Sequence, residues 1–373
     1  MKRVRALFVF ILFLILLNVR AQSTDSILAI ALKFPSDTDR VELFYKEGFS
    51  HRSTDPLYSF DCSELAERFA EKSHSVFHIA KAKSLKGILY YRKGDLPKAL
   101  LCHKQALEKR EKINDKKGMM KSHINLGNVY SDMELAIAAE RHYEEALKIA
   151  LELNENEQIP ACLLNLGTLN ANKGSLEKDS LSLFKAADYF SRALRIGKKQ
   201  NDYELQAQAL NNIAVVKMVM NRQDEAIACC MDAIKLYEMM DAETEKADTY
   251  LNLALAASYK KDVSMAEEYL LRADTIIQKH DYLSGRIQWL KQRSVQMAEK
   301  GNFEIAYNLL SKHFFLKDSL MKANAKNKRE NAYNEQQINE KKNDKDFSFP
   351  YLYFNLLVLM ALGITLSTLK NRK

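Results

Sequence analysis

Residues 122–150 read SHINLGNVYSDMELAIAAERHYEEALKIA and decide how the chain folds. Apolar residues recur three and four places apart in two runs, from Ser122 to Tyr130 and from Ala136 to Ala150, and neither run contains proline. This spacing puts the apolar side chains on one face of a helix. The stretch therefore predicts two helices joined by a short turn.

Small residues of this stretch recur along the chain at a fixed period. Three rows can be followed. The first, with gaps of 40, 47, 40, 40 and 40 residues, is Ala99, Ala139, Ala186, Ala226, Ala266 and Ala306. The second, seven residues further on, is Ala106, Ala146, Ala193, Ala233 and Ala273, with His313 in the last unit. The third, which precedes the first and has one irregular gap, is Gly87, Gly127, Gly167, Ala214, Ala254 and Ser294. Small side chains at fixed spacing allow helices to cross closely, so each unit is predicted to be a helical hairpin.

Polar turn residues recur at the same period and mark where one unit ends and the next begins. Asn and Asp favour chain reversal. They occur at Asn114-Asp115, Asn154-Glu155, Asn201-Asp202, Asp241 and His280-Asp281.

These units resemble the tetratricopeptide repeat (TPR) family, which carries a Leu-Gly pair, a tyrosine three residues later, alanines at positions 20 and 27 and an aromatic residue at position 24. One unit matches throughout, with Leu126-Gly127, Tyr130, Ala139, Tyr143 and Ala146. The next has Leu166-Gly167, Ala186, Phe190 and Ala193, but Asn170 replaces the tyrosine and seven extra residues lie around Leu176 to Leu183, a surface loop or tolerated length variation. The last three units keep the alanines and lose the glycine.

The resemblance implies an all-α fold, an α-solenoid of about six to seven TPR hairpins. The period of 40 residues exceeds the usual ~34, which indicates longer helices. Counting back one period from Ala99 and Ala106 predicts a divergent first unit over residues 38–73 of a solenoid that spans residues 38–315. Residues 22–37 are predicted to be a linker.

The N-terminus has the anatomy of a secretory signal peptide over residues 1–21. Lys2, Arg3 and Arg5 precede an apolar run from Ala6 to Leu17, and small residues stand three and one places before Gln22. The alternative is an uncleaved membrane anchor, although a run of twelve residues is short for a span. Either way the repeats are expected to leave the cytoplasm.

The C-terminal end predicts a transmembrane helix over residues 347–369. Tyr351 to Leu369 is a stretch of nineteen residues without a charge, and an aromatic cluster precedes it. Lysines flank both sides, so we take the orientation from the signal peptide. The chain is expected to be a single-pass protein of the inner (cytoplasmic) membrane, with its repeats facing the periplasm or exterior, a charged stalk over residues 316–346 and a cytoplasmic tail over residues 370–373.

Composition argues against nucleic acid as a partner. The formal charge of +8 falls to +4 once residues 1–21, with four cations and no acid, are removed. That excess is small and dispersed. The five cysteines, Cys62, Cys102, Cys162, Cys229 and Cys230, form an odd set without CxxC spacing, so no disulfide framework is implied and buried packing is expected.

No catalytic or cofactor motif is present, and we predict neither an enzyme nor a cofactor nor a metal site. HExxH, GxSxG and GxxxxGK are all missing. His74 and His78 would share one helical face and could chelate a metal, but no third ligand is near, so solvated helix surface is expected. His142 and His313 are expected to be packing or surface residues.

The TPR resemblance places a ligand groove on the first helix of each unit, and asparagines recur there at position 6. The candidate partner-binding residues are Asn125, Asn165, Asn212 and Asn252, extended by Asn128 and Asn211. An amide offers a donor and an acceptor, so a ladder of amides can hold an extended peptide by its backbone. The same amides could instead bond locally within the repeats.

The family's carboxylate clamp, which grips chaperone C-termini, is not supported. The clamp requires two asparagines and three basic residues. Asn128 and Asn165 stand at the two asparagine positions. Ile124, Gln208 and Asn212 stand where the basic residues are required, so every cation is missing.

The order of signal peptide, long repeats, a Lys-Asp-Ser-Leu motif at Lys317 to Leu320, stalk and span resembles the extracytoplasmic region of Bacteroidetes-type membrane sensor kinases and regulators. The leading hypothesis is therefore a membrane-tethered TPR protein that binds a peptide or protein partner and serves as the sensory or adaptor part of a signalling system, with a further signalling protein as partner. The alternatives are an envelope-assembly or secretion scaffold, and a truncated sensor histidine kinase or helix-turn-helix regulator without its output domain.

Overall fold

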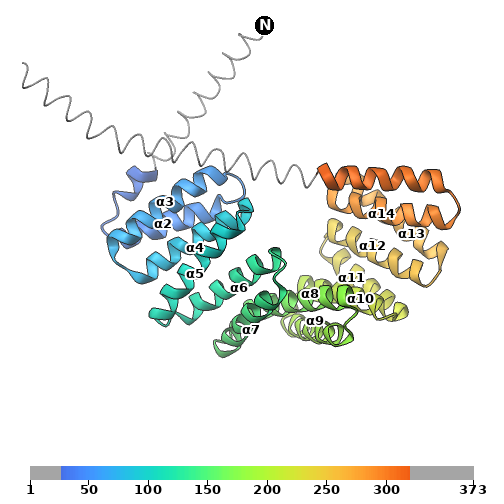
Figure 1. Cartoon of the computed structure of the whole chain (residues 1–373), viewed down its shortest axis with the longest axis horizontal. Coiled ribbons are helices and arrows are strands. Elements are labelled where there is room, and N and C mark those ends of the chain that lie inside the picture. The colour runs from blue at the N-terminus through green and yellow to red at the C-terminus, as the bar shows by residue number, and fades with distance from the viewer. Residues whose placement is uncertain (1–26, 320–373) are drawn as a thin grey trace, which may run out of the picture. The chain divides into compact units, whose positions relative to one another are not determined.

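The computed structural model describes residues 27–319. Within this range every regular element is a helix, as the sequence predicts (Figure 1). The helices are α2 (Asp37–Ser50), α3 (Pro56–Ser73), α4 (Val76–Lys93), α5 (Leu96–Lys112), α6 (Lys116–Asp132), α7 (Ala136–Glu152), α8 (Gln158–Glu177), α9 (Ser180–Gln200), α10 (Tyr203–Val219), α11 (Gln223–Met239), α12 (Glu243–Tyr259), α13 (Val263–Lys279) and α14 (Leu283–Glu299), with further helical residues at 27–31 and 303–319.

The predicted signal peptide, transmembrane helix and cytoplasmic tail lie outside the described residues, as do residues 320–346 of the predicted stalk. Of the helices that are described, none has the length and apolar character that a membrane span requires.

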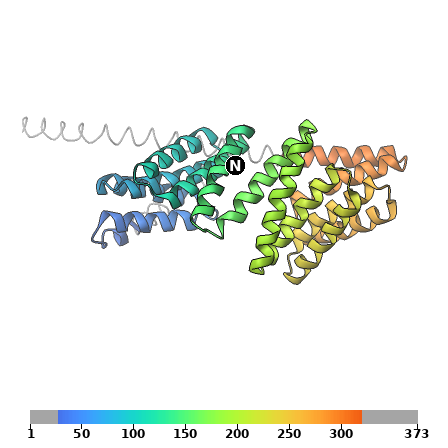
Figure 2. The same ribbon diagram turned by 90° about the horizontal axis from the view of Figure 1, so that it is seen from below.

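The helices pair into hairpins that follow one another as a solenoid of repeats. Each even-numbered helix packs against the helix that follows it, from α2 with α3 to α12 with α13. The next even-numbered helix then packs on that second helix, as α6 does on α5 and α12 on α11 (Figure 2). Even-numbered helices also touch one another, for example α10 and α12, so they share one face of the stack.

The period of 40 residues consists of two equal halves. Eight helices are 17 residues long, and three residues separate most of them. In each turn one residue adopts the left-handed backbone conformation, as at Asn114 (φ 53°), Glu134 (φ 61°) and Lys261 (φ 63°). Such a residue ends a helix and reverses the chain at once. Helix and turn together therefore measure 20 residues, both within and between hairpins.

The seven extra residues around Leu176 to Leu183 belong to the hairpin of α8 and α9, where they form helix and not a loop. α8 is 20 and α9 is 21 residues long, and the turn between them is at Lys178 (φ 55°). Seven residues equal about two helical turns, close to one for each helix. The insertion therefore lengthens both arms of this hairpin while the residues beyond it keep their register.

Three boundaries differ from the sequence-based interpretation. Residues 27–31, in the segment predicted as a linker, form a short helix that buries Ile27 and Ala31 against the first hairpin. The last helix continues to residue 319, so it includes the start of the predicted stalk. His74 and His78 do not share a helical face, because His74 ends α3 in the left-handed conformation and His78 belongs to α4.

The three rows of small residues lie where the helices cross, as the sequence predicts. Ala99, Ala139, Ala186 and Ala226 are fully buried. In the third row, a Cβ atom on Gly87, Gly127 or Gly167 would lie 2.5–2.6 Å from the ring of a residue on the second helix of the same hairpin. These ring residues, which we call the facing row, are His103, Tyr143 and Phe190.

The kind of facing residue explains why later units lose the glycine. Ala214 shares a core cluster with Cys230, and Ala254 shares it with Leu270, each sixteen residues further along the chain. Neither facing residue places a rigid ring against the first helix, so a methyl group is accommodated there. The two positions therefore change together and keep the helices of each hairpin in contact.

We expect Gly167→Ala to destabilise the protein by about 1–2 kcal/mol, because the buried Phe190 ring has no space to yield to a methyl group. In the Phe190→Leu background the same change should be neutral or stabilising, since alanine favours a helix by about 1 kcal/mol over glycine. Urea unfolding of the four proteins in the cycle measures the coupling. Equal effects in both backgrounds would show that the two positions are independent.

His103 is the one imidazole in the facing row. It is 1% exposed, and its Nδ1 atom has no hydrogen-bond partner among the described residues. Burial, reinforced by the charge of Arg110, lowers the pKa of His103 to about 4. The unfolded chain, with an ordinary histidine pKa near ~6.5, therefore binds a proton that the folded chain excludes.

Stability should accordingly fall as the pH drops from about 6.5 towards 4, because the unfolded state binds more protons in that window. His103→Phe, which copies the pairing of Phe190 with Gly167, should reduce this loss by about 1–3 kcal/mol. Urea unfolding of both proteins at pH 7, 5 and 4 tests this. A variant that loses as much stability as the parent would assign the pH dependence to other groups, such as His142.

Candidate partner-binding face on the first helices

The candidate asparagines lie on four successive even-numbered helices: α6, α8, α10 and α12. The position-6 residues Asn125, Asn165, Asn212 and Asn252 are half-buried, and each immediately precedes a buried core residue of its helix. The buried neighbour packs in the core, and the asparagine side chain lies at the edge of that core. Because these helices share a face of the stack, the four amides recur along that face.

Two parts of the candidate set are bonded within the protein. Asn252 on α12 donates through Nδ2 to Oδ1 of Asn211 on α10, at 2.9 Å. Asn128 accepts a 2.7 Å hydrogen bond from the hydroxyl of Tyr143, which is 4% exposed. These amides hold helices together. This is the local bonding that the sequence analysis gave as the alternative for all six candidate asparagines.

The other three amides are different. Among the described residues, the side chains of Asn125, Asn165 and Asn212 form no hydrogen bond. None of them is among the buried polar atoms that lack a partner, so solvent reaches them. The asparagine row therefore divides into a bonded group and a group of three with free donors and acceptors. We call the latter the open amides.

One carboxylate on the same face was missed from the sequence. Asp248 precedes Asn252 by one turn of α12 and accepts a 2.7 Å hydrogen bond from the Tyr282 hydroxyl, while its other oxygen is buried without a partner. Burial is the main cause that raises the pKa of Asp248. Its signal was available, because position 2 of the first helix belongs to the groove in the TPR pattern.

Asn170, which replaces the tyrosine of the repeat pattern, has a structural role. It is 3% exposed and donates through Nδ2 to the Leu166 carbonyl at 3.0 Å and to Glu140 at 3.3 Å. The bond to Leu166 lies within α8, and the bond to Glu140 on α7 joins neighbouring hairpins.

Histidines and cysteines contribute packing. His142 is 8% exposed, stacks on Tyr130 and lies with its Nδ1 atom 2.9 Å from that of His123, and His313 contacts the Ile287 carbonyl. All five thiols are free, and burial raises their pKa, that of Cys162 to about 12. Within residues 27–319 no group of three His, Cys, Asp or Glu side chains is placed to hold a metal ion.

Models of the tetratricopeptide repeat match residues 124–158, 207–238 and 247–280. The chain is a TPR protein. No curated protein matches this TPR chain in sequence.

Solved structures share its fold. The apo form of RapI matches with a TM-score of 0.61 and 12% identity, over 76% of this chain and 99% of that chain. A Rap protein complexed with competence and sporulation factor gives 0.55 and 17%, over 76% of each chain. Aspartyl phosphate phosphatase F from Bacillus subtilis gives 0.58 and 14%, over 74% of this chain and 70% of that chain. Identities this low establish the fold of the TPR protein and nothing about its ligand.

The division of the asparagines has a measurable consequence. Asn128→Ala should destabilise the protein by about 1–3 kcal/mol, because the buried Tyr143 hydroxyl loses its acceptor. Asn165→Ala and Asn212→Ala should each change stability by less than about 0.5 kcal/mol. Thermal and urea unfolding compare the three variants. A large loss at Asn165 or Asn212 would mean that these amides also hold the fold together.

Proposed function

We propose that this TPR protein binds an extended peptide, or an extended segment of a partner protein, along the face of its even-numbered helices. The observation that carries the proposal is the set of open amides on three successive hairpins. Each offers one acceptor and two donors, which match the carbonyl and N–H groups of a peptide backbone.

The chemistry of this face favours backbone recognition over recognition of a terminal carboxylate. The clamp positions among Ile124, Asn128, Asn165, Gln208 and Asn212 hold no cation that could pair with a carboxylate. The fold supports a peptide ligand by analogy, since one solved structure of the same fold is a Rap protein complexed with competence and sporulation factor. Another is a phosphatase, so the fold alone does not separate binding from catalysis. The proposal of binding depends on the amides.

We further propose that binding takes place outside the cytoplasm. The apolar segment at residues 6–17 and the uncharged segment at residues 351–369 support export and a membrane tether. A peptide-binding solenoid held at the membrane would act as the sensory or adaptor part of a signalling system, and a second protein would carry the output. The Bacteroidetes-type sensor arrangement of the sequence motivates this role.

Site-specific crosslinking in cells of the native host tests the proposal. A photoreactive residue is introduced at Thr168, an exposed position one turn along α8 from Asn165. The matched control carries it at Leu271, which is 67% exposed on α13. We expect a partner to be captured from Thr168 and not from Leu271, and we expect the Asn165→Ala, Asn212→Ala double variant to reduce capture at least fivefold at unchanged protein level.

The identity of the captured partner decides between the roles. A membrane kinase or regulator would support the sensory role, and envelope-assembly or secretion components would replace it with a scaffold. Capture that does not depend on the two asparagines would refute the proposed binding face.

A further inference from the structure

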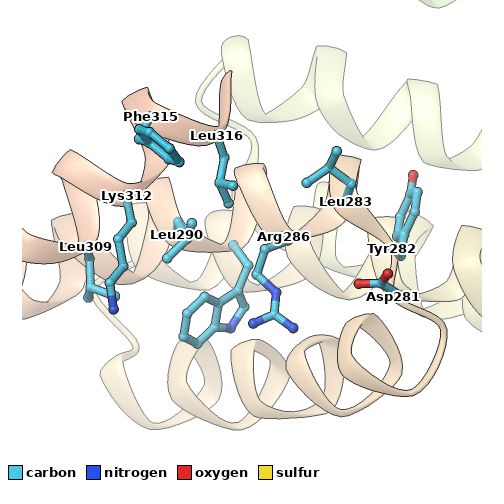
Figure 3. Close-up of a pocket in the computed structure, with 10 residues that line it drawn as sticks. Asp281, Tyr282, Leu283, Arg286, Leu290, Leu309, Lys312, Phe315 and Leu316 are labelled. Carbon is cyan, nitrogen blue, oxygen red and sulfur yellow. The ribbon is translucent and has the colours of Figure 1, made fainter. Parts of the chain in front are cut away.

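Within the described residues the last hairpin has a slot, and on each earlier hairpin the equivalent slot is occupied by the helix that follows. On each earlier hairpin the next even-numbered helix packs against the second helix, as α12 does on α11 and α14 on α13. Within the described residues no element follows helix 303–319. Between this helix and α14 lies a cavity of about 660 Å³ (Figure 3).

The floor of the slot is built like the floors that are covered by a helix. Leu316 lies one period after Ile276 and corresponds to Ile149 in the earlier repeats. Both isoleucines are 7% exposed, and Ile149 clusters with Ile159 and Cys162 of the following helix α8. Leu316 lines the slot without such a cover among the described residues. The floor of the slot therefore carries the same kind of apolar residue on which a helix packs in the earlier repeats.

One lining residue departs from the repeat in a way that internal packing does not explain. Phe315 lines the slot and is 71% exposed. One, two and three repeats earlier, the same position holds Thr275, Lys235 and Arg195, all polar. A surface position has become aromatic in the one described hairpin whose slot is open. Large exposed apolar side chains around a hollow are typical of a protein docking site.

The charges at the slot define the chemistry of its occupant. Arg286 on α14 and Lys312 on helix 303–319 both line it (Figure 3). Within residues 27–319 neither side chain forms an ion pair or hydrogen bond, and Asp281 is the only acid in the lining. The slot therefore combines an apolar floor with two available cations at its edge.

We propose that this slot binds an amphipathic helix of a partner protein, with apolar residues against Leu316 and Phe315 and acidic residues beside Arg286 and Lys312. The slot is separate from the open amides, so this inference does not depend on the proposed peptide-binding face. A protein that captures a peptide on one face and docks a helix at its last hairpin joins two partners.

The test uses the full chain in mild detergent and a synthetic peptide with the sequence of α12, ETEKADTYLNLALAASY. In the folded protein α12 occupies the equivalent slot on α11, and it carries acids at Glu243, Glu245 and Asp248. Trp289 is the only tryptophan of the chain and lines the slot, and the peptide contains none. Its fluorescence therefore reports occupancy directly.

We expect a saturable blue shift of Trp289 emission as the peptide is added. Phe315→Lys, which installs the residue found at Lys235, should weaken binding at least tenfold without unfolding the protein. Arg286→Glu with Lys312→Glu should weaken it about three- to tenfold, because each exposed ion pair contributes up to ~1 kcal/mol. That double variant should prefer a peptide in which Glu243 and Glu245 are lysine. Leu271→Asp, on the surface of α13, is the control and should have no effect.

Two results would overturn the inference. The first is binding that Phe315→Lys and the charge reversal leave unchanged. The second is a slot already closed to the peptide, shown by Trp289 emission that does not change as the peptide is added. Dependence of that emission on protein concentration would assign the slot to a second copy of the chain, and independence would assign it to residues of the same chain beyond 319.

Discussion

The contact between the two helices of each hairpin sets the dimensions of the solenoid. It is made by one small residue on the first helix and one larger residue on the second, sixteen places later in pairs such as Gly127 and Tyr143 and 23 places later for Gly167 and Phe190. Because interiors are packed at crystal-like density, neither side can grow unless the other shrinks. The pairs Gly127 with Tyr143 and Ala214 with Cys230 are two solutions of the same constraint. This contact fixes how the two helices of a hairpin cross. Because most helices and turns repeat with the same lengths, the even-numbered helices then lie on one face of the stack.

Much of this fold can be read from the sequence because its determinants repeat. The rows through Ala139 and Ala146 mark helix crossings directly, and most turns between hairpins carry Asn or Asp, as at Asn114 and Asp241. Turns within hairpins are harder to predict, because Glu134 and Lys261 adopt a left-handed conformation that their residue types do not favour. The position of the helix end imposes the left-handed conformation at these two residues, so it cannot be read from their residue types.

The binding face was predictable only in part. Residue type and position identify Asn165 and Asn252 equally, yet Asn252 bonds to Asn211 on another helix and Asn165 bonds to nothing in the described structure. That distinction depends on how α10 and α12 approach each other, which no single repeat encodes. The slot at the last hairpin was missed because its signal lies in a comparison between repeats. Phe315 stands out only when its position is compared with Thr275 and Lys235.

The hairpins of the solenoid contact their neighbours in the chain and little else. Stability in such a stack is approximately a sum of nearest-neighbour terms. A mechanical load on one end would therefore meet one interface at a time, and the stack would extend in steps of a single hairpin. Each step would release about 40 residues of chain. A partner that pulls on the last hairpin would therefore lengthen the chain there without disturbing the amides on α6, α8 and α10.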